Sequence, residues 1–123
     1  MTHWQEYVRV AYDLILESEG KSKTYLQDEV ETYVVHLFAK NFLRTDIGEQ
    51  PIALQILTTK NYQPIADECL LIHSYPLKRR RWPSDTYYRE MGTAAYSLAH
   101  IEIMEQNFEQ ASRVLHTVFN RIS

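Results

Sequence analysis

Residues 61–75 of the chain read NYQPIADECLLIHSY, and this stretch decides the fold class. Pro64 is typical of the first turn of a helix, where its missing backbone N–H removes no hydrogen bond. The apolar residues that follow cover most of the circumference of a helix, which is typical of a helix at the centre of a globular domain. We therefore predict a central helix that starts near Tyr62 and ends before Pro76. Its apolar residues are Ile65, Ala66, Cys69, Leu70, Leu71 and Ile72.

The segments on either side carry single apolar stripes with the three- and four-residue spacing of amphipathic helices. Gly20 is predicted to end the first of these helices. Thr24 and Gln27 have the spacing of a capping box, which predicts the start of the second helix. The expected fold is all-α: one compact domain, residues 1–123, made of about six helices. Besides the central helix, we expect helices at about residues 2–19, 24–43, 46–57, 84–99 and 107–122.

The composition is that of a globular protein, with 45% hydrophobic and 24% charged residues in a chain of 123. The net charge of −3 argues against nucleic acid as a partner, because the whole molecule carries no attractive positive field. The amino-terminal residues lack the pattern of a signal peptide, and no stretch approaches the roughly 18 apolar residues of a membrane span. We expect a cytoplasmic protein, and export by a route without an amino-terminal signal stays open.

Several enzyme classes lack their sequence signatures. The chain has no paired Glu-x-x-His motif for a di-metal site, no nucleophile elbow and no glycine-rich phosphate loop. Cys69 and His73 stand four residues apart on one helical face, but a single cysteine is more often a core residue than a metal ligand. We therefore expect no metal and no cofactor, we assign no catalytic residue, and we leave open whether the protein is an enzyme.

Asp67 is an acidic residue on the most apolar predicted helix. A carboxyl group buried there with an arginine or tyrosine partner is part of the scaffold, whereas one facing a cleft is a candidate functional group. A few of the nine tyrosines are candidates to line such a cleft. One hypothesis is therefore a small enzyme or ligand-binding protein with a polar pocket formed by Asp67, Tyr33, Tyr88 and Tyr96.

Gly92 lies inside a predicted helix and begins a strip of small residues with Ala95 and Ala99. Glycine within a helix costs about 1 kcal/mol relative to alanine, so a packing reason is expected. We predict that Gly92 lies against the backbone of a neighbouring helix.

A basic segment, residues 78–82, stands out in an otherwise acidic chain. It comprises Lys78, Arg79, Arg80, Arg81 and Trp82. Clustered arginines bind phosphate and carboxylate groups. The favoured functional hypothesis is a non-enzymatic interaction or adaptor protein that contacts an acidic or phosphate-bearing protein partner here, or that self-associates. The alternative for the same residues is a solvated loop whose arginines pair with helix ends.

Parts of the sequence resemble a set of small bacterial all-helical proteins of unknown function. The similar parts are residues 31–37, 66–71, 75–76, 79–81 and 87–96, within a region from about 26 to 100. The resemblance implies a helical fold and no particular reaction. It also singles out four positions for testing, which are Asp67, Arg80, Gly92 and Tyr96.

Overall fold

The computed structural model describes residues 3–44, 47, 61–75 and 85–122. Within this part of the chain six helices and no strand occur, and the helices hold 84% of the residues, so the predicted all-α fold is confirmed. The helix expected at residues 46–57 lies, apart from Ile47, outside the described residues. The helices are α1 (His3–Ser22), α2 (Asp28–Asn41), α4 (Tyr62–Ser74), α5 (Asp85–Leu98), α6 (Glu102–Gln106) and α7 (Phe108–Ile122).

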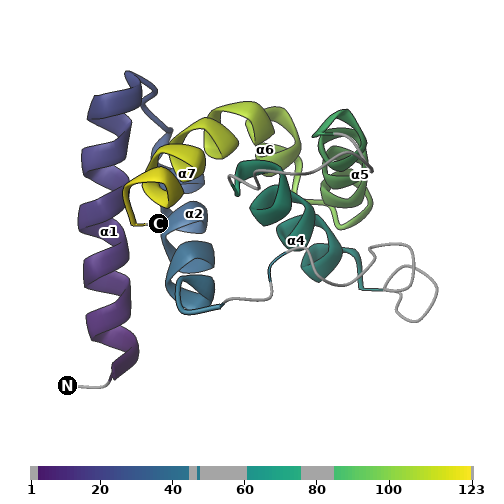
Figure 1. Ribbon diagram of the computed structural model, residues 1–123. Helices are drawn as coiled ribbons and strands as arrows, with labels where there is room; N and C mark the ends of the chain where they lie inside the picture. The colour runs from purple at the N-terminus through teal and green to yellow at the C-terminus, as the bar shows by residue number, and fades with distance from the viewer. Residues whose placement is uncertain (1–2, 45–46, 48–60, 76–84, 123) are drawn as a thin grey trace.

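The helices form one bundle, in which α1 and α5 lie at opposite sides and α2, α7 and α4 lie between them (Figure 1). Helix α1 packs against α2 and α7, and α4 packs against α5 and α7. Helix α4 thus occupies the interior position that its apolar circumference predicts.

The prediction that Gly20 ends the first helix is wrong. Helix α1 continues to Ser22, and Lys23 then turns the chain with a positive φ of 54°. The N–H of Thr24 donates to the carbonyl oxygen of Glu19 at 3.1 Å, the long bond of a Schellman motif. Lysine takes the position that glycine usually occupies, because the following residues are held against α1.

The predicted capping box of Thr24 and Gln27 is also wrong. Gln27 is the residue before α2 and makes no side-chain capping bond, while the Thr24 hydroxyl donates to the Ser22 carbonyl at 3.2 Å. Three acidic residues in the first turn, Asp28, Glu29 and Glu31, instead face the positive end of the helix dipole.

The last two predicted helices are separated by a short additional helix. Helix α5 ends in a second left-handed turn, in which His100 has a φ of 61° and the Ile101 N–H donates to the Tyr96 carbonyl at 2.9 Å. The short helix α6 follows at once, and α7 begins at Phe108 close to the predicted position. Only α6 was not predicted, because five residues are too few to establish a helical period.

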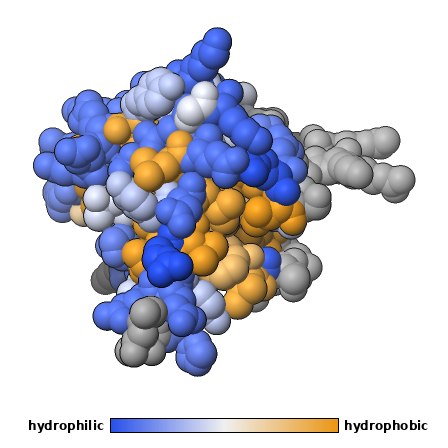
Figure 2. Space-filling model, turned by 90° about the vertical axis from the view of Figure 1, so that its left-hand side faces the viewer, coloured by the Kyte–Doolittle hydropathy of each residue, from blue (hydrophilic) through white to orange (hydrophobic). Residues whose placement is uncertain are grey.

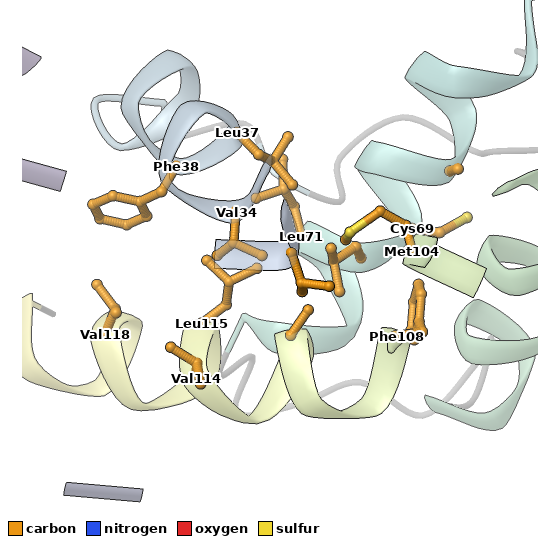
Figure 3. Close-up of a cluster of buried hydrophobic side chains, with 14 of the residues drawn as sticks. Val34, Leu37, Phe38, Cys69, Leu71, Met104, Phe108, Val114, Leu115 and Val118 are labelled. Carbon is orange, nitrogen blue, oxygen red and sulfur yellow. The ribbon is translucent and has the colours of Figure 1, made fainter. Parts of the chain in front are cut away.

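The core is formed chiefly where α2, α4 and α7 meet. Figure 3 shows side chains of α2 and α7 pointing toward one another, with those of α4 beside them. Fully buried side chains of this type contribute about 1.5–3 kcal/mol each through the area that they remove from water. Among them are Val34, Phe38, Leu70, Leu71, Met104, Phe108, Leu115 and Val118.

Gly92 lies in close contact with its neighbours, as predicted, but the neighbours are side chains rather than a backbone. A Cβ atom built on Gly92 would lie 2.6 Å from Cε2 of Phe108 and 3.0 Å from Cβ of Cys69. Phe108 on α7 and Cys69 on α4 are both buried, so the missing side chain of Gly92 is what allows α5 to approach these two helices here.

The outer face of α1, which is turned toward the viewer in Figure 2, carries apolar side chains among polar ones. Val10, Leu16 and Ile122 are exposed large apolar residues on α1 and the end of α7. None of the helices described is long and apolar enough to cross a membrane.

Candidate ligand-binding site

Asp67 joins three helices through one oxygen atom. The hydroxyl of Tyr33 on α2 donates to Oδ1 of Asp67 at 2.5 Å, and the hydroxyl of Tyr96 on α5 donates to the same oxygen at 2.7 Å. The two tyrosine rings meet edge to face, with centroids 5.9 Å apart. Two of the three tyrosines predicted to lie near Asp67 are therefore in direct contact with it.

Burial is the main influence on the protonation of this cluster. It raises the pKa of Asp67 above its usual value, while the two tyrosine hydrogen bonds and the nearby Lys40 lower that pKa in part. Burial, followed by the charge of Asp67, raises the pKa of Tyr33 and of Tyr96. Both tyrosines consequently stay protonated near neutral pH and act as fixed hydrogen-bond donors to the carboxyl group.

A groove of about 380 Å³ lies between α2 and α4, with Asp67 in its lining. This volume is in the range of small-molecule sites. Gln63, in the first turn of α4, donates to the Tyr33 hydroxyl at 3.1 Å and so extends the hydrogen-bond network along the groove. The lining residues are Glu29, Thr32, Tyr33, His36, Leu37, Lys40, Gln63 and Asp67.

An ion pair beside the groove fixes the spacing of its two helices. Arg44, just after α2, binds Glu68 on α4 through two parallel hydrogen bonds of 2.8 and 2.9 Å. Paired guanidinium and carboxylate contacts of this kind define orientation as well as distance. The two helices that form the groove are thus linked by this ion pair just after the end of α2 and by the Tyr33–Asp67 hydrogen bond.

Among the described residues, no cation is bound to Asp67. Within the described residues, no lysine, arginine or histidine forms an ion pair with Asp67, although Lys40 lowers its pKa from a distance. The His36 ring is held by its own helix, because Nδ1 lies 2.8 Å from the Thr32 carbonyl oxygen. Asp67 is therefore a partly buried acid whose described partners are all neutral hydroxyl groups.

Of the two residues weighed as metal ligands, Cys69 is buried in the core, whereas His73 on the same helix is partly buried. Burial raises the pKa of Cys69 to about 12, so that it remains a thiol. The His73 ring packs against Phe108, and its Nε2 lies 3.5 Å from Oε1 of Glu109. Across the described ranges, no group of three or more histidine, cysteine or acidic residues is arranged to hold a metal ion.

The other candidate residues from the sequence fall elsewhere. Of the three tyrosines predicted for the pocket, only Tyr33 lines the groove. Tyr96 binds Asp67 from α5 without lining the groove, and Tyr88, buried on α5, is absent from the lining. The basic segment 78–82 lies outside the described residues. The polar residues Gln63 and Lys40 were not predicted to belong to a site, because an exposed polar residue on a helix gives no sequence signal of its partner.

In comparisons with protein-family models, with curated proteins and with solved structures, nothing matches this chain. A function must therefore be inferred from the geometry of the groove. The resemblance to small bacterial proteins is not supported beyond the helical fold, and a bacterial origin stays a prediction.

Proposed function

We propose that the protein is a binding protein whose groove between α2 and α4 accepts a small ligand through a cationic group, an ammonium or a guanidinium, placed against Asp67. One observation supports this most directly: a partly buried carboxyl group lines a ligand-sized groove with two neutral hydroxyls as its described partners. A carboxylate held in such surroundings gains from an incoming cation, because burial disfavours its charge until a counter-charge is present.

The two tyrosines support a role in recognition rather than in proton transfer. Their raised pKa keeps both hydroxyls as donors, and both bonds orient Oδ1 of Asp67. A carboxylate oriented in advance loses little freedom when a ligand binds, which favours affinity. We therefore assign binding to this site and no catalytic step.

The test uses three probes of the same shape and different charge: benzylammonium, benzyl alcohol and benzoate. Binding is followed by the amide resonances of α2 and α4 in two-dimensional NMR. We expect benzylammonium alone to shift the resonances of the groove residues. Asp67→Asn should abolish this effect, and Lys40→Gln should strengthen it, since the Lys40 charge repels a bound cation.

A matched control is Glu90→Gln, which removes an exposed acid on α5 without touching the groove and should bind benzylammonium as the parent does. Equal binding of the alcohol or the benzoate, or unchanged binding by Asp67→Asn, would show that a cation is not what Asp67 recognises. If none of the three probes shifts the groove residues, the binding function itself is wrong.

We also propose, from the sequence, that the basic segment 78–82 contacts an acidic or phosphate-bearing protein partner in the cytoplasm. The concentration of four cations in a chain of net charge −3 supports this. Self-association is a further proposal, supported by the apolar side chains on the outer face of α1 (Figure 2).

A further inference from the structure

The groove between α2 and α4 is lined by charges of both signs. Glu29 and Asp67 are its acids, and Lys40, in the last turn of α2, is the lysine of its lining. Lys40 is exposed, and among the described residues it forms no ion pair. An ammonium group on a flexible four-carbon stem is well suited to meet an anion that a ligand brings.

The charges follow a fixed order along α2. Glu29 lies in the first turn of the helix, and Lys40 lies seven residues after Tyr33, roughly 10 Å farther along the axis. All three side chains line the groove, so they lie on one side of α2. The groove therefore offers an acid near the start of α2 and a cation near its end.

One oxygen of Asp67 is left for a ligand. Tyr33 and Tyr96 both donate to Oδ1, so that Oδ2 has no hydrogen-bond partner in the described part of the chain. Oδ2 is not fully buried, and because Asp67 lines the groove, this is the oxygen that a ligand reaches.

Lys40 is near enough to Asp67 to act on its charge without binding it. Burial raises the pKa of Asp67, and the positive charge of Lys40 is among the effects that lower it. No ion pair joins the two side chains in the described residues. A free acid and a free cation thus stand apart in one groove, and a molecule that carries both charges can bind both.

We propose that the ligand of the groove is an α-amino acid, whose ammonium group binds Oδ2 of Asp67 and whose carboxylate binds Lys40. The cation on Asp67 is that of the proposed function, on which this assignment rests, and the anion on Lys40 is new. An α-amino acid carries both charges on one carbon, which suits two groups that interact without touching. Glu29 repels a carboxylate at the other end of the groove and so orients the ligand.

The first experiment uses four probes that combine the two charges. Benzyl alcohol has neither, benzylammonium has the cation, mandelate has the anion, and phenylglycine has both. Phenylglycine differs from benzylammonium only by a carboxylate on the carbon that carries the ammonium group. Dissociation constants are measured with the unaltered protein from the amide resonances of α2 and α4. We expect phenylglycine to bind about two- to fivefold more tightly than benzylammonium, which is the effect of one exposed ion pair, and the other two probes to bind more weakly than either.

The second experiment repeats the titrations with variants of Lys40, whose exposed position leaves the core unchanged. Lys40→Gln should weaken the binding of phenylglycine by about two- to fivefold while it strengthens that of benzylammonium. A general distortion of the groove would weaken both, so the opposite signs are specific to the anion. Lys40→Arg should retain the preference for phenylglycine, and Glu90→Gln, far from the groove lining, should bind both probes as the parent does.

The outcomes separate this assignment from the proposed function. If benzylammonium binds but phenylglycine binds no more tightly, or if Lys40→Gln leaves the affinity for phenylglycine unchanged, the anion site is wrong and the cation site on Asp67 stands. If neither of the two ammonium probes shifts the groove residues, the proposed function fails and the amino-acid ligand with it. The four-probe comparison needs only the unaltered protein, so it decides the matter even if a variant fails to fold.

Discussion

Gly92 and Gly20 allow one substitution to be tested in two environments. Both are glycines within helices, and neither has a positive φ, so alanine fits the backbone at both positions. A Cβ on Gly20 meets nothing within 4 Å, whereas one on Gly92 would lie 2.6 and 2.9 Å from two ring atoms of Phe108 and 3.0 Å from Cβ of Cys69.

The two substitutions are expected to change the free energy of unfolding for different reasons. Gly20→Ala should stabilise the protein by about 0.5–1 kcal/mol, because alanine loses less backbone freedom in a helix. Gly92→Ala gains a similar amount but must push apart Phe108 and Cys69, and overpacking a dense core costs about 1–3 kcal/mol. The propensity gains largely cancel in the comparison, so Gly92→Ala should be less stable than Gly20→Ala by about 1–3 kcal/mol.

The assay is urea unfolding followed by circular dichroism at one pH, for the parent and the two variants. Phe108→Leu, combined with Gly92→Ala, provides the mechanistic control, because the smaller side chain removes the ring that Cβ would meet. The double variant should show a favourable coupling energy in a double-mutant cycle. If Gly92→Ala is as stable as Gly20→Ala, the close contact between α5 and α7 is not rigid and the argument fails.

Two further predictions concern the groove and the basic segment. Tyr96→Phe removes a buried hydroxyl that donates to Asp67, and we expect a loss of about 1–3 kcal/mol in unfolding free energy, measured by urea unfolding. A loss near zero would mean that Asp67 is already neutral or solvated. Changing Arg79, Arg80 and Arg81 together to glutamate should leave the melting temperature nearly unchanged while it abolishes capture of an anionic partner, a binding that should also weaken with added salt. A large fall in melting temperature would assign these arginines to the fold, for example as partners of Asp67.

The fold class was predictable because it depends on local pattern. The apolar residues of α4 and α7 repeat with the helical period whatever their neighbours are. The end of α1 and the start of α2 were not predictable, because tertiary contacts decide them. Gly20 could end a helix in isolation, but α1 continues since the Glu19 carboxyl binds the Leu26 N–H and fixes the path of the connection.

The site was predictable only in part, for a related reason. Asp67 stands out as an acid among apolar neighbours, and the structure places Tyr33 and Tyr96 on it. Nothing in the sequence distinguishes Tyr33 and Tyr96, which donate to Asp67, from Tyr88, which lies on α5 as Tyr96 does. Which tyrosine reaches the carboxyl is set by how α5 lies against α4, and a sequence pattern does not contain that angle.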